Sequence, residues 1–166
     1  MIRAFVALGS NLGNPVQIVE DAIEAMAALR GSLLMAISSL YRTAPVGTSE
    51  KLRHQPDFIN AVVALDTRLN PRDLLDELFT VEARFGRQRS VKNAPRTLDL
   101  DLLLHGDTVQ DDPDVTLPHP RMHERAFVLA PLAEIAPELV IPGRGPVAAL
   151  LAACAGQRVH ALARRQ

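Results

Sequence analysis

The sequence predicts an α+β fold in which a ferredoxin-like βαββαβ core sandwich precedes an irregular, helical C-terminal third. Stretches with strand periodicity occur at 2–8, 33–41, 58–69 and 97–105. Stretches with helical periodicity lie after the first and third of these, at 15–30 and 71–85. This order predicts two helices packed against an antiparallel sheet. Seven of the twelve prolines lie between Pro113 and Pro146, which favours loops and short helices there.

The first strand and helix are marked by an apolar stretch followed by a cap. Ile2–Leu8 alternates and is apolar enough for a central strand. A loop then leads to Asn14, a good N-cap, and to Pro15, which suits the first position of a helix. Apolar residues recur at helical spacing as far as Gly31, which favours the end of the helix.

A long loop separates the second strand from the third. Leu33–Tyr41 predicts the second strand, and Arg42–Asp57, which contains two prolines and a glycine, predicts the loop. Loops of that length are usually functional or mobile. Phe58–Leu69 predicts the third strand. Its residues on one face are Phe58, Asn60, Val62 and Ala64.

The second helix repeats the start of the first. Asn70 and Pro71 form the same cap-then-proline pair, and apolar residues follow at helical spacing up to Phe85. Gly86–Pro95 then predicts a second loop, which leads into the fourth strand, and that strand ends near His105.

Two further helices are predicted in the C-terminal third. One covers Arg121–Leu129 with Pro120 at its start, and the other covers Pro146–Cys154. The tail from Arg158 to Gln166 has no predicted role.

Length and composition are those of one globular domain over residues 1–166. A net charge of −1 gives no argument for nucleic acid or an anionic membrane as a partner. The single cysteine, Cys154, excludes a disulfide within the chain and suits a reducing cytoplasm. No apolar run is long enough for a signal peptide or a membrane span. We therefore expect a soluble, cytoplasmic protein, and a monomer by default.

Two carboxylates interrupt the apolar fourth strand. Asp99 and Asp101 share one face with Thr97, while leucines occupy the other face. In a buried strand such a pair is costly and calls for a partner. Side chains two apart lie about 6.7 Å apart along a strand, so they could hold one or two hard cations, Mg²⁺ above all. The pattern leaves open the alternative that both acids lie on a solvent face.

A basic loop precedes the acid pair. It contributes Arg87, Arg89, Lys92 and Arg96. On charge alone a solvated loop explains these residues, but the loop must end near the acids. Cations beside a metal–carboxylate pair suit a polyphosphate, whose charge two acids alone would repel.

Other motifs are weaker by pattern. His119 and His123 have no third residue of the right type for zinc, so helix-start and surface roles fit better. The Gly9–Gly13 loop precedes a helix and could bind an anion, but it lacks a P-loop or dinucleotide fingerprint. Phe58 and Phe127 are typical of core positions.

With these residues in view, the chain resembles the 6-hydroxymethyl-7,8-dihydropterin pyrophosphokinase (HPPK) family of folate biosynthesis. The similarity runs in family order over about residues 4–142. The Pro95–Asp101 run (PRTLDLD) is its most specific segment. The other matching segments are Ala7–Leu12, Ser39–Pro45, Gln55–Ala61, Leu117–Arg121 and Ala133–Leu139.

The resemblance implies a reaction and a set of residues. The β,γ-diphosphate of ATP would pass to the 6-hydroxymethyl oxygen of the dihydropterin and leave AMP, with two Mg²⁺ ions on Asp99 and Asp101. Arg87 and Arg96 would join these acids as catalytic residues. Matching ATP-binding positions are Glu82, Arg87, Arg89, Arg96, Leu102, Thr116, His119 and Arg125. Matching pterin-binding positions are Thr43, Pro45, Val46, Phe58, Asn60 and Phe127, with the two phenyl rings enclosing the pterin.

Two loops depart from the family pattern. The 47–56 loop is longer than in the best-known relatives, and the 87–95 loop is shorter and carries Asn93 where some relatives have a tryptophan. These departures bear on how the site closes over its substrates, not on the acid pair.

Two alternatives stay open from the residues alone. One is a non-catalytic ferredoxin-like module whose acids hold a structural or regulatory cation. The other is a metal-dependent phosphodiesterase or nuclease with water as its nucleophile, against which the near-neutral charge argues.

Overall fold

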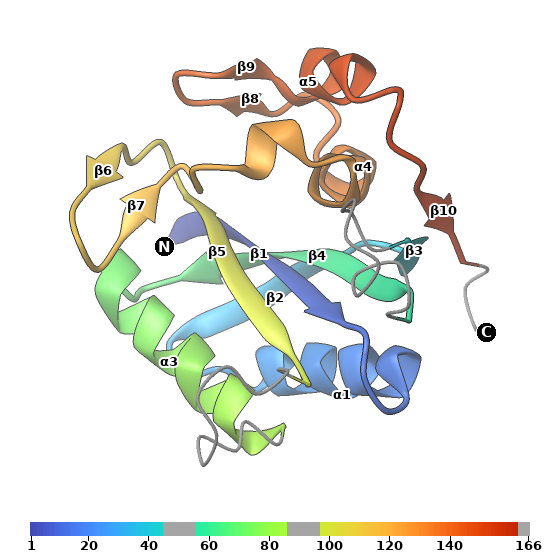
Figure 1. The fold of residues 1–166 in the computed structure, drawn as a ribbon. Coiled ribbons are helices and arrows are strands. Elements are labelled where there is room, and N and C mark those ends of the chain that lie inside the picture. Colours follow the sequence, from blue (N-terminus) through green and yellow to red (C-terminus); the bar gives the residue numbers. More distant parts are fainter. Residues whose placement is uncertain (45–55, 86–96, 163–166) are drawn as a thin grey trace.

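The computed structural model describes residues 1–44, 56–85 and 97–162 (Figure 1). Its helices are α1 (Pro15–Ala27), α3 (Pro71–Arg84), the 3-10 helix η1 (Met122–Glu124), α4 (Ala126–Ile135) and α5 (Val147–Ala153). Its main strands are β1 (Ile2–Ser10), β2 (Ser32–Ile37), β3 (Tyr41–Thr43), β4 (Phe58–Thr67) and β5 (Asp99–His105). The short strands are β6 (Gln110–Asp111), β7 (Thr116–Leu117), β8 (Val140–Ile141), β9 (Gly145–Pro146) and β10 (His160–Ala161).

An antiparallel sheet forms the middle layer of a mixed α/β fold. Its strand order is β10-β3-β4-β1-β5, and β2 pairs with β4 on the same side as β3. Helices α1 and α3 cover one face, and α4 with α5 covers the other (Figure 1). Each face of the sheet therefore has its own apolar core, and the second core, under α4, borders a cavity.

The prediction of one continuous strand over Leu33–Tyr41 is wrong, because the structure has two strands there. β2 ends at Ile37 and β3 begins at Tyr41. Between them the Ser38 hydroxyl accepts a 2.9 Å hydrogen bond from Val62 N, and Ser39 N donates to both carboxylate oxygens of Glu134, at 3.1 and 3.0 Å. Side chains thus interrupt the backbone ladder, which periodicity cannot reveal.

The acid-bearing strand β5 lies at an edge, since among the described strands it pairs with β1 alone. Leu98, Leu100 and Leu102 pack in the α1/α3 core, which confirms the predicted alternation of faces. Asp99 and Asp101 are only half-buried, however. The expectation that this strand buries two carboxylates is therefore wrong, because they border a cavity.

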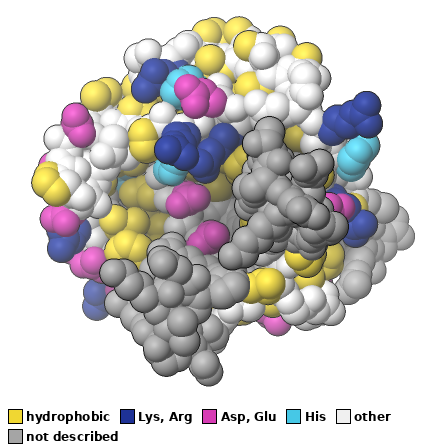
Figure 2. All heavy atoms as spheres, in the orientation of Figure 1, with side chains coloured by type: hydrophobic (Ala, Val, Ile, Leu, Met, Phe, Trp, Pro, Cys, Tyr) yellow, Lys and Arg dark blue, Asp and Glu magenta, His cyan; other side chains and the backbone are white. Residues whose placement is uncertain are grey.

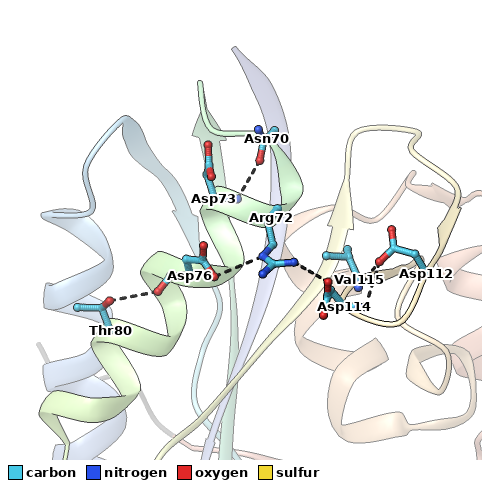
Figure 3. Close-up of polar contacts among 8 residues, drawn as sticks. All are labelled: Asn70, Arg72, Asp73, Asp76, Thr80, Asp112, Asp114 and Val115. Atoms are coloured by element: carbon cyan, nitrogen blue, oxygen red, sulfur yellow. Dashed lines mark hydrogen bonds and ion pairs between the residues drawn. The ribbon is translucent and has the colours of Figure 1, made fainter.

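Both predicted helix starts are confirmed. Asn14 Oδ1 accepts from Gln17 N at 3.3 Å, and Asn70 Oδ1 accepts from Asp73 N at 2.8 Å. Beside the second cap, Arg72 pairs with Asp114 of the β6–β7 hairpin at 2.7 Å (Figure 3). This pair ties α3 to the segment that follows β5.

The helix predicted at Arg121–Leu129 begins later than expected. The short helix η1 stops at Glu124, and α4 starts at Ala126. Arg125 between them is extended, with φ −118° and ψ 107°, so the chain turns at the cavity. The second predicted helix is confirmed as α5, while the three short strand pairings of this region had no periodic signal.

None of the helices in the described part of the chain has the length and apolar character needed to cross a membrane.

Candidate active site

A cavity of about 760 Å³ lies between the sheet and the start of α4. This volume is within the range of small-molecule sites. Figure 2 shows acidic, basic and histidine side chains gathered around a hollow in this face of the molecule. The cavity is lined by Ala7, Leu8, Gly9, Thr43, Ala44, Phe58, Asn60, Ala61, Asp99, Asp101, Arg121, Glu124, Arg125, Phe127, Val128 and Gln157.

The acid pair forms one side of the cavity. Asp99 and Asp101 are opposite Gly9 and Ala7 of β1, so no large side chain separates them from the cavity floor. Because alternate residues share a face, both carboxylates leave β5 toward the same space. The shared face is the one that the alternation along this strand predicts.

The residues present fit a hard cation such as Mg²⁺. In the described ranges no cluster of three or more His, Cys, Asp or Glu side chains is placed to hold a metal. Zinc would want such a closed set of ligands, whereas Mg²⁺ is usually held by one or two carboxylates with water and phosphate oxygens. Asp99 and Asp101 supply the carboxylates and face a cavity with room for the other ligands.

Basic side chains approach the acids from the segment before α4. His119 N donates to Leu103 O at 2.9 Å, which anchors this segment to β5. Burial lowers the pKa of His119, and the nearby Asp101 charge opposes that effect while Arg125 and Arg121 add to it. His119 therefore lies within electrostatic reach of Asp101, and Arg121 and Arg125 line the cavity.

The other side of the cavity is aromatic and amide-bearing. Phe58 and Asn60 come from the start of β4, and Phe127 comes from the first turn of α4. Asn60 is 7% exposed, and its Nδ2 donates a 2.9 Å hydrogen bond to the buried Thr43 Oγ1. That bond holds the amide plane, because it uses one of two N–H donors and fixes the side-chain rotamer.

Phe58 and Phe127, which their pattern assigns to the core, border the cavity, and Phe127 also packs against the core under α4. Both are half-buried and line the cavity. The Arg125 guanidinium carbon lies 5.5 Å from the Phe127 ring centroid, a cation–π distance. A planar, electron-poor ligand would therefore meet two apolar rings here, one from the sheet and one from the helix.

Four predicted ATP contacts are not part of the cavity lining: His119, which lies near Asp101, and Leu102, Thr116 and Glu82. The Leu102 side chain is packed in the α1/α3 core, and Thr116 is exposed in β7. Glu82 is 3% exposed and accepts a 2.8 Å hydrogen bond from Leu100 N, between the two acids. Its carboxylate thus contacts the backbone of the acid-bearing strand.

Five predicted residues lie outside the described ranges: Pro45, Val46, Arg87, Arg89 and Arg96.

Nine lining residues were missing from the sequence prediction: Ala7, Leu8, Gly9, Ala44, Ala61, Arg121, Glu124, Val128 and Gln157. Gly9 and Arg121 lie in segments that the sequence singled out, so their neighbourhood was a usable signal. Glu124 adjoins His123 in one of these segments, whereas Gln157 had no signal, because it is far along the chain and reaches the cavity only through the fold.

The fold and the cavity define a class: a mixed α/β protein in which a carboxylate pair and two phenyl rings line one cavity of small-molecule size. Residues 5–137 match the profile of the 7,8-dihydro-6-hydroxymethylpterin-pyrophosphokinase (HPPK) family. The chain belongs to that family.

Relatives of the chain carry the corresponding enzyme name. The Pseudomonas aeruginosa 2-amino-4-hydroxy-6-hydroxymethyldihydropteridine pyrophosphokinase is 45% identical over 160 residues, which cover 96% of each chain. The protein of the same name from Haemophilus influenzae is 44% identical over 142 residues, or 86% of each chain.

The fold is similar to that of a larger protein of known structure. Plasmodium falciparum HPPK-DHPS superposes with a TM-score of 0.69 at 14% identity, covering 92% of this chain and 44% of that one. At this identity the likeness concerns the fold alone. The chain spans less than half of that protein.

Proposed function

We propose that this chain transfers the diphosphate group of ATP to the 6-hydroxymethyl oxygen of 6-hydroxymethyl-7,8-dihydropterin. In this reaction the substrate oxygen attacks the β-phosphorus, the bond between that phosphorus and the α,β-bridging oxygen breaks, and AMP leaves while the hydroxyl proton is lost. One observation carries the proposal: a single cavity is lined by the acid pair and by a buried amide with two phenyl rings. The family and the names of the relatives agree with it.

The amide and the rings would bind the pterin. Phe58 and Phe127 offer apolar faces to a flat bicyclic ring, which stacks well on phenyl groups. One N–H of the Asn60 side chain is bonded to Thr43. Its second N–H and its carbonyl oxygen could form a donor and acceptor pair with the amide edge of the pterin. A site that pairs such groups rejects analogues that lack them. Pro45 and Val46 remain proposed pterin contacts.

The acid pair would hold Mg²⁺ beside the ATP phosphates. When bound, Mg²⁺ supplies charge neutralisation at the phosphates and lowers the pKa of a nearby hydroxyl. Asp99 and Asp101 are the carboxylates that would bind it, and without a cation they would repel a triphosphate. The resemblance to the family implies two such ions.

Basic residues would complete the phosphate site. His119 lies within electrostatic reach of Asp101, and Arg125 lines the same cavity as the acid pair, so both suit an anionic substrate. The remaining residues proposed for ATP are Glu82, Arg87, Arg89, Arg96, Leu102 and Thr116, with Arg87 and Arg96 also proposed as catalytic.

The finer expectations about the molecule are part of the same proposal. The strand order and the antiparallel pairing support a ferredoxin-like core. We retain a single catalytic domain over 1–166, a monomeric state and a cytoplasmic location as predictions from composition.

The decisive experiment measures AMP release from ATP with the pterin and Mg²⁺ present together and each omitted in turn. The proposal expects AMP only in the complete mixture, and loss of turnover with excess chelator that added Mg²⁺ restores. Release of AMP or phosphate without the pterin would favour a hydrolase with water as nucleophile. A chain that binds neither Mg-ATP nor the pterin by calorimetry would be a non-catalytic module.

A further inference from the structure

The start of α4 is capped from outside its own segment. The residue before the helix, Arg125, makes no side-chain cap. The Ala126 N–H instead donates a 3.0 Å hydrogen bond to Gln157 Oε1, thirty-one residues further along the chain. Helix starts leave backbone N–H groups without helical partners, and an accepting side chain stabilises them. Gln157 therefore supplies the cap that the local sequence lacks.

The other end of the Gln157 amide fixes the segment before α4. Gln157 Nε2 donates a 2.8 Å hydrogen bond to Glu124 O, the last residue of η1. One amide thus bridges the end of η1 and the start of α4 across the extended Arg125. This turn carries two cavity residues, Arg125 and Phe127, whose side chains lie in cation–π contact.

Gln157 is itself held by the fold on both sides. Its N–H donates to Cys154 O at 2.9 Å, at the end of α5. A few residues later β10 pairs with β3, and Leu162 N donates to Leu40 O at 2.8 Å. Strand β3 ends with Thr43, the partner of Asn60. The segment from 157 to 162 therefore connects the start of α4 to β3. It lies outside residues 5–137, which match the family.

We infer that Gln157 is a positioning residue for the pterin end of the site, acting through the Arg125–Phe127 turn. This inference rests on the proposed function for the identity of the ligand. Gln157 lines the cavity, and its hydrogen bonds to the described residues go to the turn before α4 and to Cys154, not to the acid pair of β5. On this turn Phe127 is one of the two proposed ring contacts, whereas Arg125 is one of eight proposed ATP contacts, so the loss of Gln157 should affect the pterin more than ATP.

The test compares Gln157→Ala with Gln157→Glu in the full chain. A lost helix cap of about 1 kcal/mol corresponds to a roughly fivefold effect. We expect Gln157→Ala to raise the KM for the pterin by about fivefold, with the KM for ATP and kcat changed less than about twofold. Gln157→Glu keeps an oxygen for the buried Ala126 N–H, and the exposed Glu124 carbonyl can bind water, so this variant should recover most of the affinity.

A matched control is Gln110→Ala. Gln110 also donates a side-chain hydrogen bond, to Asp112 at 2.6 Å, but it lies in the β6–β7 hairpin and is no part of the cavity lining. This variant should keep both KM values of the wild type.

A second readout does not depend on activity. Hydrogen exchange of the Ala126 amide, measured by NMR, should be about fivefold faster in Gln157→Ala and unchanged in Gln110→Ala. If that amide exchanges faster while the pterin KM stays constant, or if the KM values for pterin and ATP rise together, Gln157 has only a structural role and the inference is wrong. An inactive wild type whose Ala126 amide still responds to Gln157→Ala would instead overturn the proposed function.

Discussion

Gly9 and Asn60 face each other across β1 and β4 so closely that a Cβ atom on Gly9 would lie 3.0 Å from Asn60 Oδ1. Asn60 has little freedom to move aside, because it is buried and bonded to Thr43. On its other side Gly9 pairs with Asp99. Because Gly9 has no side chain, the cavity stays open between Asn60, proposed to bind the pterin, and Asp99, proposed to bind Mg²⁺.

Replacing Gly9 with alanine should displace the Asn60 amide. Overpacking a tight site costs about 1–3 kcal/mol, so we expect the pterin dissociation constant to rise by roughly tenfold or more in Gly9→Ala. Calorimetry should find ATP affinity within about twofold of the wild type, since the displaced group belongs to the other substrate. Gly156→Ala is the control, because a Cβ there meets nothing within 4 Å. Unchanged pterin affinity in Gly9→Ala would contradict this role of the glycine.

Removing either carboxylate of the acid pair should abolish turnover without unfolding the chain. Asp99→Ala and Asp101→Ala each take away a proposed Mg²⁺ ligand, worth several kcal/mol in the transition state, so AMP formation should fall by about 10³-fold or more. Both side chains are half-buried beside a cavity, so circular dichroism and the melting temperature should change little.

The control for the acid pair is Asp107→Ala, an exposed acid just after β5. It should retain wild-type turnover. Near-normal AMP formation in either Asp99→Ala or Asp101→Ala would exclude the proposed metal assignment.

Truncation of Phe127 tests whether its ring binds the pterin or only packs in the core. Phe127→Ala removes one apolar wall of the cavity, and we expect pterin affinity to fall by about 10- to 100-fold with a much smaller change for ATP. Phe79→Ala is a suitable comparison, because Phe79 is 42% exposed on α3, away from the cavity lining. Equal losses of pterin and ATP affinity in Phe127→Ala would show that this ring serves the core alone.

Glu82 should contribute to stability through the acid-bearing strand. Glu82→Ala leaves the buried Leu100 N–H without this acceptor, which costs about 1–3 kcal/mol in the free energy of unfolding by urea. Glu82→Gln keeps an amide oxygen at that position and should lose less. If Glu82→Ala has the same free energy of unfolding as the wild type, the hydrogen bond to Leu100 does not contribute to stability. A fall in ATP affinity in the stable Glu82→Gln variant would support its proposed place near the nucleotide.

Tyr41 offers a clean spectroscopic test of how α4 is joined to β3. Its hydroxyl donates a 2.6 Å hydrogen bond to Glu134 Oε1. Burial raises the pKa of Tyr41 above its ordinary value, and the hydrogen bond to the Glu134 carboxylate adds to the rise. The chain has one tyrosine and no tryptophan, so phenolate absorbance at 295 nm reports on this residue alone.

We expect Tyr41 to stay protonated well above pH 10 while the chain is folded. Because the folded pKa exceeds the unfolded value of about 10, the stabilisation is complete below that pH and is lost as the pH rises above it. Glu134→Gln should bring the titration closer to the ordinary value. A phenolate that appears near pH 10 in the folded wild type would contradict the Tyr41–Glu134 contact.

Local patterns determined most of the secondary structure and the membership of the family. The cap-then-proline pairs at Asn14 and Asn70 define helix starts through contacts within three residues. The alternation along β5 set which face carries Asp99 and Asp101, because successive side chains on a strand must point to opposite sides. Such features depend on neighbouring residues alone, so the sequence contains them.

Only the tertiary structure decided which of these residues meet. Asn60, Gly9 and Asp99 become neighbours because β4, β1 and β5 pair in that order, and pairing between distant segments is set by how both apolar cores pack. The breaks at Ser39 and at Arg125 are fixed by contacts with Glu134 and Gln157, which lie 95 and more than 30 residues away. The sequence pattern was enough to predict the acid pair. Its position on an edge strand, beside a cavity that Phe58 and Phe127 also line, could be known only from the tertiary structure.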